Sequence, residues 1–172
     1  MSNFFNKSDL SRKDAENIVS ETLHKCDDGE LYLENSKSES IVLDDNKIKG
    51  SNYSSDLGYG LRAVTGEVVA YSHSNEISKK SLKRSSENLQ STLKSKKGTY
   101  NHIISKTNEK FYNDINPIEE KSLNSKLEIL KEVNNYIRNK DSIVQQVTAS
   151  FAGEHTSIEI IRSGGEILTD VR

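Results

Sequence analysis

The stretch DLGYGLRAVTGE, Asp56 to Glu67, contains three of the nine glycines of the chain. Its Gly58-x-Gly60-x-x-Ala63 spacing matches the fingerprint of a dinucleotide-binding loop, which needs a strand before the glycines and a helix after them. The residues between Gly60 and Gly66 are too few for that helix. We therefore reject a nucleotide site and predict two strands around a tight turn at Thr65-Gly66, spanning Tyr59–Val64 and Val68–Ser72.

Gly58 and Gly60 fall on one face of the first of these strands and leave that face bare. Glycine inside a strand marks a place where another group comes close, and two interpretations stay open. The glycines relieve crowding against a helix, or they form a shallow groove to which an extended peptide adds as a further strand. The groove gives four candidate substrate-binding residues: Gly58, Tyr59, Gly60 and Arg62. Arg62 would hold a carboxylate of the substrate or of a structural partner such as Glu67.

Alternating apolar and polar residues predict further strands on both sides of this stretch. Leu31 and Leu33 mark one strand, and Ile41 and Leu43 lead into a hairpin at Asp45-Asn46. The C-terminal part predicts a β-meander with turns at Gly153-Glu154 and at Ser163-Gly164-Gly165, and its strands span Ile143–Phe151, Thr156–Arg162 and Glu166–Val171.

Apolar residues at helical spacing predict three helices. The first runs from Ser8 or Ser11 to Lys25, with Ser11-x-x-Asp14 as a capping box and Gly29 in a left-handed turn beyond it. The second spans Ile77–Leu93, and the polar, basic segment Lys94–Thr99 then predicts a loop. The third begins at Asn116-Pro117, and its apolar stripe comprises Leu123, Leu127, Leu130, Val133 and Ile137.

The order helix, strands, helices, β-meander predicts an α+β fold, with a mixed, largely antiparallel sheet and helices packed on one face. A chain of 172 residues suits a single domain spanning 1–172.

The composition argues against nucleic acid and membrane as partners. Charged residues make up 29% of the chain but the net charge is only −2, so no electrostatic attraction to phosphates or anionic lipids is expected. The longest apolar runs, such as Val68–Tyr71, are too short to cross a bilayer, and the N-terminus lacks the features of a signal peptide. A single cysteine, Cys26, excludes a disulfide framework and indicates the cytoplasm. The charges of Asp27 and Asp28 predict that its thiol is inert.

No combination of residues predicts an active site. The four histidines never lie three or four residues apart, as zinc-binding pairs on a helix do: His24, His73, His102 and His155. Glu154-His155 falls in a predicted turn, and Asp27-Asp28 and Asp44-Asp45 lack the alternating ligands of a calcium loop. We expect no catalytic residue, no metal site and no cofactor in this chain.

Several stretches, in the same order, resemble the N-terminal domain of the TldD/PmbA family of zinc metallopeptidases, also known as DNA gyrase modulators. The most specific are Gly58-x-Gly60-x-Arg62-Ala63 and Thr65-Gly66-Glu67, whereas Ser95–Asn113 matches least. The matching stretches are GELYLENSKSESIVLDDNKIK (Gly29–Lys49), DLGYGLRAVTGEVVAYSHSNEIS (Asp56–Ser78), EKSLNSKLEILKEVN (Glu120–Asn134) and VQQVTASFAGEHTSIEIIRSGGEILTDVR (Val144–Arg172). The TldD branch is the most similar.

This resemblance implies zinc-dependent cleavage of unfolded or leader peptides by a TldD-type subunit paired with a related subunit. The family's metal motif, His-Glu-x-x-x-His with a distant thiolate, would lie in a catalytic domain after Arg172, so no catalytic or metal residue is transferred to this chain. The chain would then be a non-catalytic part of a longer enzyme, inactive alone, that helps to form the substrate channel and subunit contacts.

The alternative is a stand-alone peptide- or protein-binding module without peptidase activity. The reading frame after Arg172 would distinguish the two hypotheses. We also expect self-association through a bare strand edge, because unpaired edges favour pairing.

Overall fold

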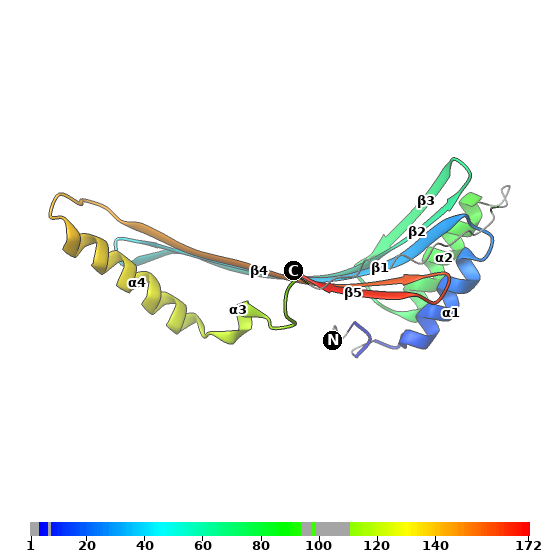
Figure 1. The fold of residues 1–172 in the computed structure, drawn as a ribbon, viewed down its shortest axis with the longest axis horizontal. Coiled ribbons are helices and arrows are strands. Elements are labelled where there is room, and N and C mark those ends of the chain that lie inside the picture. Colours follow the sequence, from blue (N-terminus) through cyan, green and yellow to red (C-terminus); the bar gives the residue numbers. More distant parts are fainter. Residues whose placement is uncertain (1–3, 7, 94–97, 99–110) are drawn as a thin grey trace. The chain divides into compact units, whose positions relative to one another are not determined.

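The structure is a computed structural model that describes residues 4–6, 8–93, 98 and 111–172. Apart from Gly98, the predicted loop Lys94–Thr99 lies outside the described residues. The elements, shown in Figure 1, are α1 (Arg12–Leu23), β1 (Asp28–Asp44), β2 (Lys47–Thr65), β3 (Val68–Ser74), α2 (Lys79–Leu93), α3 (Pro117–Glu120), α4 (Leu123–Lys140), β4 (Thr148–Arg162) and β5 (Ile167–Val171).

The five strands form one sheet in the order β3-β2-β1-β4-β5. β2 and β3 pair antiparallel from Tyr59 opposite Ser74 to Thr65 opposite Val68, and β4 and β5 are also antiparallel. This antiparallel sheet with its helices confirms the predicted α+β class.

Two tight turns confirm the predicted hairpins. Asp45 and Asn46, between β1 and β2, have φ values of 46° and 63°, the left-handed conformation that a two-residue hairpin turn requires. Gly66 has φ 57° in the turn between β2 and β3, where glycine carries no steric cost.

The predicted turn at Gly153-Glu154 is wrong, because β4 runs through these residues without a break. Side chains of β4 and β1 meet on both sides of this point. The hydroxyls of Ser36 and Thr156 lie 3.0 Å apart, and Thr148 donates a hydrogen bond of 3.0 Å to Asp44. Pairing with a distant strand has therefore overridden a local turn signal.

The chain divides into two compact units. The first comprises Met1–Asn35, Asp56–Tyr112 and Ser157–Val171, and the second comprises Ser36–Ser55, Asn113–Thr156 and Arg172. β1, β2 and β4 contribute residues to both units. The prediction of one domain spanning 1–172 stays a prediction.

The core of the first unit lies between its strands and the helices α1 and α2, which contact each other (Figure 1). α1 begins as predicted, with the Ser11 side chain accepting a hydrogen bond of 3.0 Å from the Asp14 amide and donating one of 2.7 Å to the Asp14 carboxylate. The buried apolar residues include Ala15, Val19, Leu23, Leu31, Leu33, Leu61, Ala63, Leu82, Leu89 and Ile161.

The predicted left-handed turn at Gly29 is also wrong. Gly29 lies in β1, and a Cβ atom there would lie 2.6 Å from Leu23 Cδ2 and 2.7 Å from the Arg62 carbonyl oxygen. Glycine at this position allows the end of α1 to approach the sheet closely.

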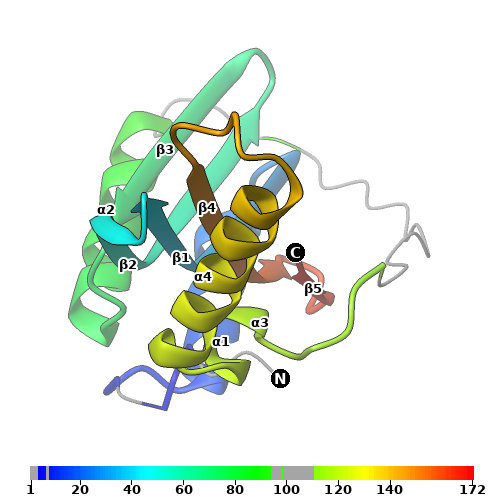
Figure 2. The same ribbon diagram turned by 90° about the vertical axis from the view of Figure 1, so that its left-hand side faces the viewer.

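The second unit has its own small core, in which Leu130 of α4 packs with Ile41, Leu43 and Ala149. α4 faces the viewer in Figure 2. The prediction of one continuous helix from Asn116 onward is wrong. Lys121 has an extended backbone and separates α3 from α4. Ser122 then caps α4 by accepting a hydrogen bond of 3.2 Å from the Ser125 amide.

The predicted apolar stripe of this helix is only partly buried. Leu130 is buried, but Leu123 and Val133 are 46% and 41% exposed, while the buried positions of α4 also include Lys126. Lys126 is 2% exposed, forms an ion pair with Glu39, donates a hydrogen bond of 2.6 Å to the Ile118 carbonyl and lies 5.7 Å from the Phe151 ring centre. A buried ammonium requires such partners.

Removing one member of this pair should destabilise the second unit strongly. Glu39→Leu leaves the Lys126 charge buried without its carboxylate, and we expect a loss of about 3–5 kcal/mol in the free energy of unfolding. The double variant Glu39→Leu/Lys126→Met should recover most of that loss. Urea denaturation measures both, with the exposed Glu132→Gln on α4 as control. Equal midpoints for Glu39→Leu and the wild type would contradict this.

Candidate functional site

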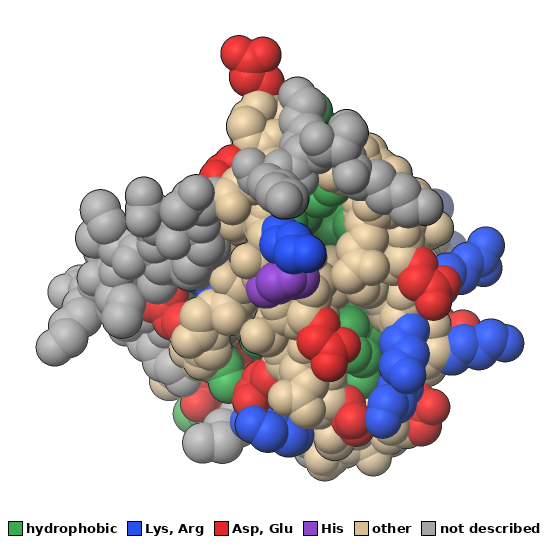
Figure 3. Space-filling view, turned by 90° about the vertical axis from the view of Figure 1, so that its right-hand side faces the viewer, with side chains coloured by type: hydrophobic (Ala, Val, Ile, Leu, Met, Phe, Trp, Pro, Cys, Tyr) green, Lys and Arg blue, Asp and Glu red, His purple; other side chains and the backbone are tan. Residues whose placement is uncertain are grey.

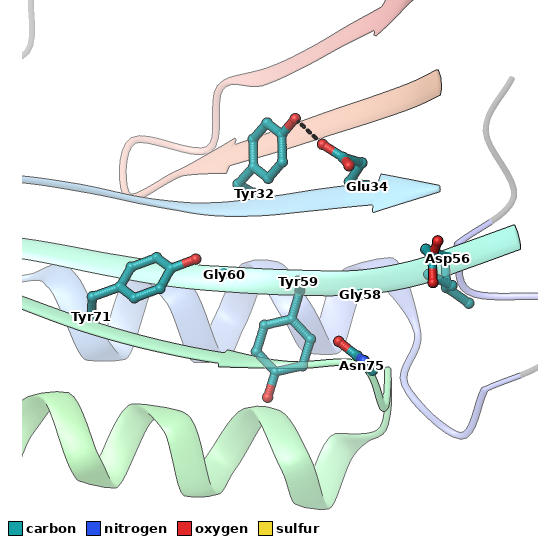
Figure 4. A pocket seen from close by; sticks show the side chains of 9 residues that line it. Tyr32, Glu34, Asp56, Gly58, Tyr59, Gly60, Tyr71 and Asn75 are labelled. Carbon is teal, nitrogen blue, oxygen red and sulfur yellow. Dashed lines mark hydrogen bonds between the residues drawn. The ribbon is translucent and has the colours of Figure 1, made fainter. Parts of the chain in front are cut away.

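The candidate site is an open pocket of about 250 Å³ on the sheet of the first unit (Figure 4). Its strand residues alternate with core residues such as Leu31, Leu33 and Leu61, so it lies on the face of the sheet opposite α1 and α2. The lining residues are Tyr32, Glu34, Asp56, Leu57, Gly58, Tyr59, Gly60, Tyr71 and Asn75.

Gly60 lies beneath the side chain of Tyr71. A Cβ atom at Gly60 would collide with the Tyr71 hydroxyl oxygen and lie 3.0 Å from ring atoms Cε2 and Cζ. The group that crowds Gly60 is therefore a tyrosine of the neighbouring strand β3, not a helix. Glycine in a strand covered by an aromatic ring from the adjacent strand is a known way to stabilise a sheet.

Gly58 and Tyr59 contribute main-chain atoms to the pocket. A Cβ atom at Gly58 would lie 2.9 Å from the Ser74 carbonyl oxygen, so only glycine fits this approach of β3. The Tyr59 side chain points toward α2, and its hydroxyl lies 2.9 Å from both Ser81 Oγ and Ser85 Oγ (Figure 4). Tyr59 is 5% exposed, so its side chain is not available to a ligand in the pocket.

Strand addition along Tyr59–Val64, the predicted mode of peptide binding, is wrong. β2 is an inner strand between β1 and β3, so its amides and carbonyls already pair. Any peptide in the pocket must lie on the face of the sheet and contact side chains.

Arg62 forms ion pairs with two carboxylates of β1, and neither is the predicted partner Glu67. Its Nη2 lies 2.5 Å from Asp28 Oδ2 and its Nε 3.3 Å from Glu30 Oε1. Burial acts to lower the pKa of Arg62, but the hydrogen bond to Asp28 and the charges of Glu30 and Asp28 outweigh it, so the pKa lies above its ordinary value. Arg62 is outside the pocket lining and holds β1 to β2.

Six residues of the pocket lining were not among the predicted candidates: Tyr32, Glu34, Asp56, Leu57, Tyr71 and Asn75. Glu34 accepts a hydrogen bond of 2.6 Å from the Tyr32 hydroxyl. The signal for Tyr32 and Glu34 was their alternation with the core residues Leu31 and Leu33, which places them on the outer face of β1.

The acidic pairs, Glu154-His155 and Cys26 are the other residues that the sequence singled out. Within the described part of the chain, no group of three or more His, Cys, Asp or Glu residues could hold a metal ion. Asp27 accepts a hydrogen bond of 2.6 Å from the Gly66 amide, and Glu154-His155 lies inside β4. Burial raises the pKa of the Cys26 thiol and the charge of Asp27 adds to this shift, which is the direction that the sequence predicts.

Basic and acidic side chains are interspersed on the face of the molecule in Figure 3. Neither sign of charge dominates this face. None of the described helices combines the length and the apolar character needed to span a membrane.

Two segments of the chain match models of two domains of one family. Residues 29–95 match the PmbA/TldA metallopeptidase domain 1, and residues 116–172 match the PmbA/TldA metallopeptidase central domain. The chain belongs to the TldD/PmbA family. This confirms the resemblance found in the sequence, and the pocket lies wholly within the segment that matches domain 1 of the family.

Curated relatives of the family are named "Metalloprotease TldD homolog". The one from Buchnera aphidicola subsp. Acyrthosiphon pisum is 35% identical over 149 residues, which cover 86% of this chain and 31% of the relative. The one from Haemophilus influenzae is 30% identical over 172 residues, covering 96% of this chain and 35% of the relative. The chain thus spans about a third of the length of these relatives.

Two solved structures share the fold of this chain. A putative modulator of a DNA gyrase from Thermotoga maritima has a TM-score of 0.73 at 14% identity, covering 92% of this chain and 36% of that one. TldE from Thermococcus kodakarensis has a TM-score of 0.62 at 15% identity, covering 92% of this chain and 37% of that one.

A double-mutant cycle can test the packing of the Tyr71 ring over Gly60. Gly60→Ala should lower the free energy of unfolding by about 1 kcal/mol, since the exposed Tyr71 ring can move away only by giving up its packing. In the Tyr71→Ala background this loss should disappear. Thermal unfolding of the four proteins completes the double-mutant cycle.

Gly50→Ala in the same strand is the matched control, because no atom lies within 4 Å of a Cβ at Gly50. We expect no loss of stability there. A loss at Gly60 that persists without the Tyr71 ring would show that another contact requires the glycine.

Proposed function

We propose that this chain is the non-catalytic N-terminal part of a cytoplasmic TldD-type metallopeptidase. In this proposal it helps to form the substrate channel and the subunit contacts for proteolysis of unfolded or leader peptides. The match to two metallopeptidase domains, and relatives about three times as long that are named metalloproteases, support it.

The pocket is the observation that carries the substrate-channel role. It lies on the outer face of the sheet and is open to solvent, with the exposed Tyr71 ring above Gly60. An extended polypeptide can lie across such an open surface and place its side chains against the residues that line the pocket.

The family name implies a metal, and the resemblance in sequence implies zinc. Zinc in proteins needs three or four converging nitrogen, sulfur or oxygen donors. The described residues do not supply such a set, so they do not fit a zinc site. We therefore assign zinc to the catalytic domain of the full enzyme and derive no step through it.

The 172-residue chain alone should bind, but not cleave, an unfolded polypeptide. A reduced and alkylated polypeptide, incubated with the chain and zinc, should stay intact on gels while fluorescence anisotropy reports its binding. Binding is expected because the pocket lies in this chain. Cleavage is not expected, because the described residues do not supply the set of zinc ligands. Metal-dependent cleavage that survives repurification, or a lack of binding, would overturn the proposal.

Exposed apolar residues of α4 support the proposed subunit contacts. Ile129, Val133 and Tyr136 are 39%, 41% and 64% exposed and lie four and then three residues apart, so they form one stripe along the helix. Apolar stripes of this kind often mark protein contacts. We assign this stripe to contact with a related family subunit or a second copy of the chain.

Val133→Asp should weaken that association roughly tenfold or more, because a carboxylate would be buried in an apolar contact. Asn135→Asp adds the same charge about half a turn around the helix and should leave the association unchanged. Sedimentation velocity of the chain, alone and mixed with a related family subunit, measures both. Equal association of both variants would exclude α4 as the contact surface.

A further inference from the structure

We propose that the pocket binds a positively charged side chain, arginine or lysine, of the polypeptide that lies across it. This inference rests on the proposed function and specifies it, since it names the kind of side chain that the substrate channel selects at this point.

The size of the pocket fits one side chain. Pockets for drug-sized ligands measure about 300–1,000 Å³. At about 250 Å³ and open to solvent, this pocket is suited to a single long side chain whose main chain stays outside.

The charge of the pocket is negative. Glu34 and Asp56 both line it, and its nine lining residues include no lysine or arginine. Arg62, two residues beyond Gly60 on β2, is bound by Asp28 and Glu30 and so does not neutralise the pocket. Glu34 accepts one hydrogen bond from Tyr32, and a carboxylate has capacity for further donors.

Two tyrosines provide the walls. Tyr71 is 64% exposed and lies over Gly60. Its ring also stacks on His73, with ring centres 5.8 Å apart. Tyr32 stands on the other side of β2, on β1 (Figure 4). An aromatic face attracts a guanidinium or ammonium group, and a carboxylate beside it pairs with the same cation.

Other side chains suit this lining less well. An acidic side chain would meet two like charges. An apolar side chain would remove water from Glu34 and Asp56 without giving either carboxylate a further hydrogen bond, which costs free energy. A cation can pair with a carboxylate of the lining and contact an aromatic ring beside it.

The test compares two peptides of the same shape, Ac-Gly-Gly-Arg-Gly-Gly-amide and the same peptide with citrulline in place of arginine. Isothermal titration with the whole chain should show roughly tenfold tighter binding of the arginine peptide. Raising the salt concentration from about 0.05 M to about 0.5 M should reduce this preference, because the site is open to solvent.

Variants assign the preference to the pocket. Asp56→Asn and Glu34→Gln should each reduce the preference for arginine over citrulline several-fold, and Tyr71→Leu should weaken the arginine peptide more than the citrulline peptide. Glu87→Gln, on the exposed side of α2, makes the same charge change outside the pocket and should have no effect. Circular dichroism confirms that each variant folds.

The inference is overturned if the two peptides bind equally, or if Glu87→Gln lowers the preference as much as Asp56→Asn. If the unfolded polypeptide still binds in that case, the proposed channel role stands and only the charge preference is lost. If neither the peptides nor the unfolded polypeptide bind, the proposed channel role is overturned as well.

Discussion

The alternation of side chains along β2 is the constraint on which the first unit depends. Tyr59, Leu61 and Ala63 point into the core beneath the sheet, which places Gly58 and Gly60 on the opposite face. A shift of one residue would bury the pocket face and expose the core face. The close approach of Gly29 to the end of α1, and the Arg62 pairs with Asp28 and Glu30, hold β1 and β2 in this register.

The same glycines that resemble a nucleotide fingerprint have a different physical use here. The element that follows them is the strand β3 and not a helix, so they do not lead into a helix N-terminus that could hold a phosphate. They allow β3 to bring Tyr71 and the Ser74 carbonyl close to β2. The resulting surface has aromatic walls and acidic side chains, which favours a polypeptide over the negatively charged phosphates of a nucleotide.

The second unit depends on charge as much as on apolar packing. Its apolar core is small, and Lys126 enters it with Glu39 and the Ile118 carbonyl as partners. Because Lys126 and Leu130 occupy the buried side of α4, apolar residues such as Val133 remain at the surface. A structural ion pair thus leaves an apolar stripe exposed, and this stripe is where we assign the subunit contact.

The sequence by itself determined the elements whose signals are local. The Ser11 cap, the turns at Asp45-Asn46 and Gly66, the α+β class and the family all follow from short patterns or from resemblance. Only the tertiary structure decided what depends on distant partners. β4 continues through Gly153-Glu154 because β1 pairs with it, and Lys126 is buried because Glu39 meets it. The pocket forms because Tyr32 of β1 and Tyr71 of β3 lie on either side of two glycines of β2. Such long-range pairings leave no fixed spacing in the sequence, so local patterns cannot predict them.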